Sequence, residues 1–142
     1  MEIVEHSVLL VASQDVVWKK MVDWQDWPTW DCDMESVHFP DALGYGAVGR
    51  LKLKGGPKVL LCVTDFHPGE SYISEFQLLG TRLIFGHTLK PVNESATMMT
   101  FTVRAQGLTA FLVVNSVKSK ITKGLPEHIR NFQFGLQQDV QK

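Results

Sequence analysis

The chain has 142 residues, 44% of them hydrophobic and 20% charged, with a formal net charge of −1 at pH 7. This length predicts one domain, residues 1–142, with one hydrophobic core. A net charge this close to zero gives no overall attraction to nucleic acid or to an anionic membrane, so we expect neither as a partner. No apolar run approaches the roughly 20 residues that cross a bilayer, so we expect no integral membrane segment.

Cysteine usage gives no sign of a disulfide framework or a zinc site. Cys32 and Cys62 are far apart in the sequence, without a second cysteine or a histidine cluster beside either. Asp31, Cys32 and Asp33 form a small acidic cluster, but two carboxylates and one thiol in a loop are a poor metal site. We therefore expect no metal and no cofactor. The N-terminus lacks a secretory leader pattern, so the expected compartment is the cytoplasm.

The first element is a strand over residues 3–11, where apolar and polar residues alternate. Its inner face includes His6. Leu9 and Val11 fall on the outer face, which suggests a partner surface or a covering loop there, and a homodimer is one form that a partner surface could take. Ser13 follows as the expected N-cap of a short helix.

Three of the four tryptophans lie between Trp24 and Asp31. Pro28 disfavours a long helix here, so we expect a short helix or a turn. A tryptophan buries a large area and needs a partner for its indole N–H. We expect Trp24 to anchor the structure, whereas Trp27 and Trp30 either anchor it or line the mouth of a pocket.

About six strands follow, because short segments of alternating polarity are separated by turns that contain glycine or proline. Their expected ranges are 34–39, 48–54, 58–66, 71–79, 82–92 and 96–105. The spacing and the short connections indicate an antiparallel meander.

The last element is predicted to be one long amphipathic helix from Thr109 to Gln138, because apolar residues recur there every three or four positions. Thr109 is its expected N-cap, and Gly124 and Pro126 predict a bend. A meander must cover its apolar face, and this helix offers the apolar stripe to do so. We therefore predict an α+β helix-grip fold. A curved antiparallel sheet of six to seven strands wraps around the C-terminal helix, with two short helices after the first strand.

Several segments, in this order, carry a resemblance to a known family. They are the strand, cap and VVW of His6 to Trp18, DWQDWPTWD (Asp23 to Asp31), VGR (Val48 to Arg50), the strand of His87, the strand end at Gly107, and KGLPEHIRNF (Lys123 to Phe132). The chain resembles the START-like superfamily with the Bet v 1 fold, and within it the polyketide cyclase/dehydrase and lipid-transport group (SRPBCC). The resemblance spans nearly the whole chain. It implies the helix-grip fold, but the superfamily combines carriers, hormone-binding proteins, cyclases and oxygenase domains without shared catalytic residues.

One helix cannot fill the concave face of such a sheet, so we expect a mostly apolar cavity with a few polar groups. The candidate ligand-binding residues are Trp27, Trp30, Phe39, Phe85, His87, Met99, Phe101, Phe111, Val114 and His6. His87 is the first catalytic candidate, with Glu75 as its possible carboxylate neighbour. The alternatives are a hydrogen-bonded interior histidine and an exposed cross-strand pair. We expect His38, His67 and His128 on the surface.

Three functions remain open on these grounds. The first is binding of a small hydrophobic or amphipathic ligand, lipid- or polyketide-like, without chemistry, and the small number of inward titratable groups favours it. The second, which the resemblance permits, is a cyclase or dehydratase that uses His87 as acid or base and needs no metal. The third is a protein-interaction domain that uses its outer face.

Overall fold

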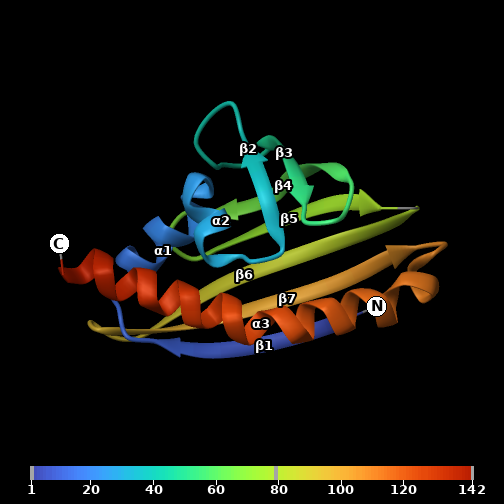
Figure 1. The fold of residues 1–142 in the computed structure, drawn as a ribbon. Coiled ribbons are helices and arrows are strands. Elements are labelled where there is room, and N and C mark those ends of the chain that lie inside the picture. The colour runs from blue at the N-terminus through green and yellow to red at the C-terminus, as the bar shows by residue number, and fades with distance from the viewer. Residues whose placement is uncertain (1, 79, 142) are drawn as a thin grey trace.

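A seven-stranded antiparallel sheet and one long helix make up most of the molecule (Figure 1). The structure is a computed structural model and describes residues 2–78 and 80–141. The strands are β1 (Glu2–Leu10), β2 (Met34–His38), β3 (Val48–Leu53), β4 (Lys58–His67), β5 (Ser71–Leu78), β6 (Thr81–Asn93) and β7 (Ala96–Gly107). The helices are α1 (Gln14–Val22), α2 (Trp27–Trp30) and α3 (Ala110–Gln141), with a 3-10 turn at Trp24–Asp26. The predicted helix-grip fold is confirmed.

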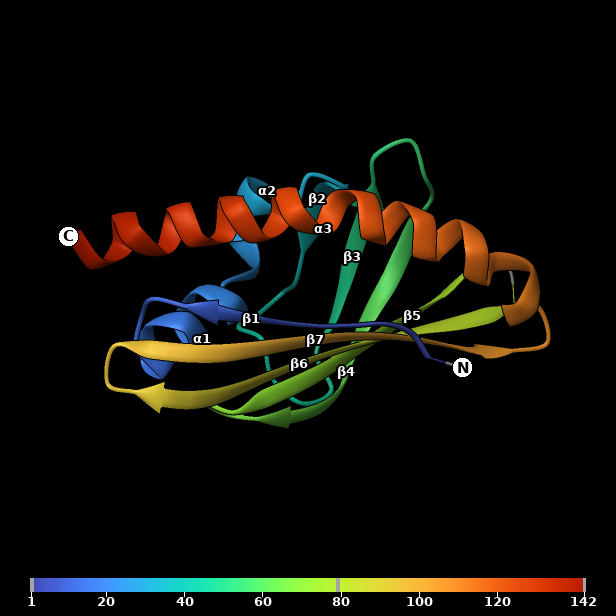
Figure 2. The same ribbon diagram turned by 90° about the horizontal axis from the view of Figure 1, so that it is seen from below.

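The sheet is a meander whose two ends come from the first two strands of the chain. Its order is β1-β7-β6-β5-β4-β3-β2, and all neighbouring strands are antiparallel. Figure 2 shows α3 along one face of this sheet, with β2 and β3 rising toward the helix on one side. The curvature leaves α3 facing a concave surface rather than a flat one.

The pairing register aligns four inward side chains across β1, β7, β6 and β5, from one edge of the sheet to its centre. His6 on β1 pairs with Phe101 on β7, Phe101 pairs with His87 on β6, and His87 pairs with Tyr72 on β5. Because paired residues in a sheet project to the same face, all four belong to one row. The row places two imidazoles and a phenol on the concave face of the sheet.

The short helices are fixed at the end of the sheet by capping and by indole hydrogen bonds. Ser13 is the N-cap of α1 as predicted, and its Oγ accepts from the Val16 N–H at 3.4 Å. Trp27 is buried and donates its indole N–H to the Met21 carbonyl at 2.9 Å. Trp24 donates to the Asp41 carbonyl at 3.1 Å, which fits the expected anchoring role.

α3 is a single helix that continues through Pro126, although proline cannot donate to the carbonyl four residues before it. Its C-terminal half is the better buried, with Phe132 and Leu136 each 2% exposed. Phe111, in the first turn, is 69% exposed. The expectation that Phe111 faces inward is wrong, because Ala110 takes the inward position and the next residue is rotated by about 100°.

The surface bears out other local expectations. Leu9 and Val11 are exposed, at 48% and 74%, and β1 is an edge strand. His38 and His67 are exposed as predicted. Within the described residues, no helix is long and apolar enough to cross a membrane.

Candidate functional site

A cavity of about 380 Å³ lies between the inner face of α3 and the concave face of the sheet. Most of its lining is apolar. The sheet contributes side chains that include Val8, Leu51, Leu61, Phe76, Leu83 and Met99. The helix contributes Val117, Ile121, Leu125, Ile129 and Phe132. The polar lining consists of His6, Asp31, Asp33, Ser74, His87, Ser116, Lys120 and His128, besides the polar atoms of Trp27, Trp30 and Tyr72.

The structure brings most of the predicted ligand-binding residues to this cavity. Those that line it are His6, Trp27, Trp30, Phe85, His87, Met99 and Phe101. Three others lie elsewhere. Phe39 is 1% exposed and packs in the core against Trp24 and Trp27, Val114 packs against the core beside the lining, and Phe111 faces outward. Phe39, Val114 and Phe111 are therefore not part of the cavity wall. Ligand binding by the seven residues that line the cavity stays a prediction.

His87 lies on the cavity wall among aromatic rings. Its imidazole stacks on the Tyr72 ring at a centroid distance of 4.3 Å and an interplanar angle of 16°, and Phe101 flanks it at 5.3 Å. Part of the imidazole is accessible from the cavity, but its Nδ1 atom is buried and has no hydrogen-bond partner. Burial lowers the pKa of His87 to about 4, because a charged imidazolium would lose its hydration there. The side chain is therefore neutral at pH 7.

Glu75 is not a partner of His87. Ser74 and Phe76 line the cavity, so the side chain between them projects to the other face of β5. There the Glu75 carboxylate lies 3.8 Å from Nε of Arg82 in an exposed cross-strand pair. The expected alternative for Glu75 thus matches its position, and any proton transfer by His87 would lack a carboxylate beside it.

A third histidine of the lining, His128 of α3, reaches the cavity and was wrongly expected on the surface. Its side chain is only 15% exposed, and its Nε2 lies 3.1 Å from Asp31 Oδ1 and 3.5 Å from Asp33 Oδ2. The sequence did contain a signal for this position. Ile121, Leu125, His128 and Phe132 follow steps of four, three and four, so His128 continues the inward stripe of the helix.

The loop after α2 supplies the carboxylates that meet His128. Asp31 Oδ1 also accepts from the Asp33 backbone N–H at 3.0 Å, which fixes its orientation. Burial raises the pKa of Asp31, and the charge of His128 acts in the opposite direction. This loop and α3 together make a polar edge on an otherwise apolar cavity.

Trp30 completes this edge with an unused donor. Its ring meets the Phe132 ring edge-on at a centroid distance of 5.1 Å, and its indole Nε1 is buried without a hydrogen-bond partner. A buried indole N–H normally has a partner, so the unsatisfied donor requires an explanation.

Solved structures with the same fold cover nearly the whole chain. A conserved protein from Geobacillus kaustophilus has 18% sequence identity and a TM-score of 0.72, with 94% of each chain covered. A START superfamily protein from Mycobacterium smegmatis has 14% identity and a TM-score of 0.72, covering 97% of this chain and 99% of that one. The Zhui aromatase/cyclase from Streptomyces sp. R1128 has 15% identity and a TM-score of 0.73, covering 96% and 94%.

At these identities, the structural matches establish the fold and leave the activity open. No curated protein matches the sequence significantly. A family model described as polyketide cyclase / dehydrase and lipid transport matches residues 1–130. The chain therefore belongs to the polyketide cyclase / dehydrase and lipid transport family.

Proposed function

We propose that the protein binds a small amphipathic molecule, lipid- or polyketide-like, in the cavity between the sheet and α3. The observation that carries this proposal is the position of the unsatisfied polar atoms. Among the described residues, three buried side-chain nitrogens lack a hydrogen-bond partner: Trp30 Nε1, His87 Nδ1 and His128 Nε2. All three residues line the cavity. Buried polar groups are normally satisfied, so their gathering at one space supports a ligand whose polar groups complete them.

The size and chemistry of the cavity agree with such a ligand. A volume of about 380 Å³ lies within the range of small-molecule sites, and a mostly apolar wall with a few convergent polar groups is their usual composition. The apolar wall would hold a chain or fused rings. The nitrogens of Trp30 and His87 would then fix the orientation of its oxygen-bearing groups.

Catalysis by a cyclase or dehydratase mechanism is the second candidate, and the free Nδ1 of His87 is the observation that favours it. One structural neighbour is named an aromatase/cyclase. A pKa of about 4 keeps the His87 imidazole neutral, which makes it a weak base at neutral pH. Since Glu75 lies on the other face, binding is the better-supported function of the two.

The first test is native mass spectrometry of the purified protein, with the denatured mass as reference. A retained small molecule would identify the ligand class directly. Intrinsic tryptophan fluorescence then follows titration with a medium-chain fatty acid and with a polycyclic aromatic ketone, because Trp27 and Trp30 line the cavity.

A variant that fills the cavity tests whether the probes bind there, and a matched surface variant is its control. Met99→Trp places a larger ring in the lining, whereas Leu60→Trp adds the same ring at a side chain that is 60% exposed. We expect Met99→Trp to abolish binding and Leu60→Trp to leave it unchanged. A protein without a retained molecule and without saturable binding of either probe would refute the proposal. Turnover of a polyketide-like substrate that disappears in His87→Ala would favour the second candidate.

A further inference from the structure

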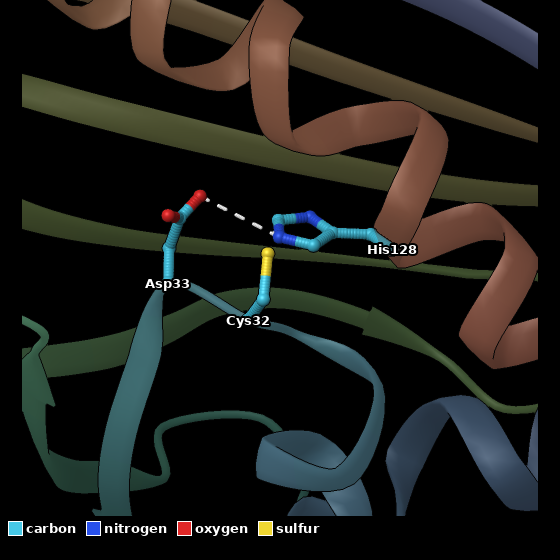
Figure 3. Close-up of side chains that lie close together, drawn as sticks. All are labelled: Cys32, Asp33 and His128. Carbon is cyan, nitrogen blue, oxygen red and sulfur yellow. Dashed lines mark ion pairs between the residues drawn. The ribbon is translucent and has the colours of Figure 1, made fainter.

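Cys32, Asp33 and His128 bring three different metal-binding groups together at the edge of the cavity. Cys32 and Asp33 come from the loop after α2, and His128 comes from α3, almost one hundred positions later in the chain. Figure 3 shows the thiol, the carboxylate and the imidazole pointing toward one another. One ligand atom from each lies within 4.8 Å of the other two. The expectation of a poor metal site considered only the acidic loop and lacked the histidine.

The spacing of the imidazole nitrogen and the carboxylate oxygen is that of two groups that share an ion. Zinc binds imidazole nitrogen and carboxylate oxygen at about 2.0–2.2 Å, so two such ligands in a tetrahedral site are roughly 3.4 Å apart. His128 Nε2 and Asp33 Oδ2 are 3.5 Å apart. His128 Nε2 is also buried and makes no hydrogen bond, even though two carboxylates lie within ion-pair distance. The imidazole nitrogen therefore faces the carboxylates of Asp31 and Asp33 without making a hydrogen bond to either.

We propose that Cys32 Sγ, a carboxylate oxygen of Asp33 and Nε2 of His128 bind one divalent transition-metal ion of the zinc class. A set of one sulfur, one nitrogen and one oxygen suits a borderline ion such as Zn²⁺, and not Mg²⁺ or Ca²⁺, which require oxygen ligands. Three protein ligands leave a fourth position for water or for a ligand atom. Asp33 and His128 line the cavity, so that position faces it.

Gly124 keeps the space for this cluster open. A Cβ atom at position 124 would lie 2.8 Å from Asp33 Oδ2 and 3.3 Å from His128 Nε2. Gly124 is four residues before His128, so both occupy the same face of α3. Any other residue at this position would push the carboxylate or the imidazole out of place.

The carboxylates around the cluster favour a cation, whereas the positive charge of Lys120, which acts on Asp31, opposes one. Asp31 lies 3.1 Å from His128 Nε2, and Glu127 adds a second carboxylate near the thiol. Without a cation, burial and the charge of Asp33 raise the pKa of the Cys32 thiol. On binding, the thiol releases its proton to solvent and the sulfur forms a bond to the metal, which neutralises the clustered negative charge.

The test is titration of the metal-free protein with Co²⁺ alone and then with Zn²⁺ in competition. We expect one Co²⁺ per chain, visible d–d bands of a tetrahedral site and a thiolate-to-cobalt charge-transfer band. Cys32→Ser should remove the charge-transfer band, and His128→Gln should weaken affinity at least as much as the roughly 10–100-fold that loss of an outer-shell partner typically costs. Cys62→Ser and His67→Gln are the matched controls, since Cys62 is the other free cysteine and His67 pairs with Asp65 on the surface.

A second measurement, on the unaltered protein, tests whether Cys32 binds the metal ion even if the variants fail to fold. Zn²⁺ should protect Cys32, but not Cys62, from alkylation by iodoacetamide, as read by peptide mass spectrometry. Absence of the charge-transfer band, or equal alkylation of Cys32 with and without Zn²⁺, would overturn the proposal. So would a band that persists in a folded Cys32→Ser variant.

Discussion

His87 is the residue whose surroundings most constrain its chemistry. It is stacked on Tyr72, flanked by Phe101 and left with an unsatisfied Nδ1. Such a side chain is suited to exchanging a hydrogen bond with a bound molecule rather than to carrying charge. Its burial lowers the stability of the folded protein when the pH falls, because His87 then binds a proton in the unfolded chain but not in the folded one.

Replacing His87 with Phe should remove one source of acid sensitivity. The pKa of His87 is about 4 in the folded protein, against 6.5 for a free histidine. Between these pH values the unfolded state binds more protons at this residue than the folded state. The free energy of unfolding is therefore unaffected by His87 protonation above pH 6.5 and falls as the pH drops toward 4. The residue should account for up to about 3 kcal/mol of that loss. Urea unfolding at several pH values would show a flatter profile for His87→Phe, while His67→Gln should keep the steeper one.

Gly49 on β3 is required for tight packing rather than for backbone freedom. An added Cβ would lie 2.7 Å from three atoms of the Phe39 ring, which is itself only 1% exposed. Gly49→Ala must displace that buried ring and should cost about 1–3 kcal/mol. Gly44→Ala is the control, because nothing lies within 4 Å of its added Cβ. Equal free energies of unfolding for the two variants would contradict this account.

At the scale of elements, periodicity predicted the strands and the long helix well. β3 alternates Leu51 and Leu53 with Arg50 and Lys52, and this pattern alone identifies a strand with one face in the core. The alternation of β6 likewise placed Phe85 and His87 on the cavity wall. Local patterns of this kind carry enough information because each strand contributes one face to a common core.

The metal-binding cluster and the position of Glu75 depend on contacts that no local pattern specifies. The cluster joins a loop to a helix turn almost one hundred residues away, and its geometry depends on how α3 is rotated over the sheet. A helix rotates by about 100° per residue, so neighbouring residues were expected on different faces, but His128 and Ile129 both line the cavity. Glu75 was a candidate carboxylate neighbour of His87 because the pairing between strands is not visible in the sequence.

The contact between α1 and α3 offers a test of a buried ion pair. Lys20 of α1 has a 6% exposed side chain, bonds Asp26 at 2.6 Å and lies 5.6 Å from the centre of the Phe132 ring of α3. Asp26→Ala leaves the ammonium buried without a partner and should cost about 3 kcal/mol. Lys20→Met keeps the packing without the charge and should cost less than about 1 kcal/mol. Chemical denaturation would compare them, and a larger loss for Lys20→Met would contradict this reasoning.

For the whole molecule, the cavity separates two parts, the sheet and α3, that we expect to differ in stability. The sheet is held by continuous pairing, above all between β6, β7 and β1. α3 packs through one stripe, part of which faces the cavity, and its first turns expose Phe111 and Leu112. An element with few buried contacts opens at a lower free energy than a fully paired strand.

Hydrogen exchange should therefore distinguish the helix from the sheet. We expect amides in the first half of α3 to exchange before those of β6 and β7, because opening the helix over a cavity breaks few contacts. A bound amphipathic molecule would contact both layers and should slow exchange in α3 more than in the sheet, since binding stabilises only the closed arrangement. Mass spectrometry of peptides after timed exchange would measure both effects. Slower exchange in α3 than in β6 and β7 without ligand would mean that the helix is held by more than its inner stripe.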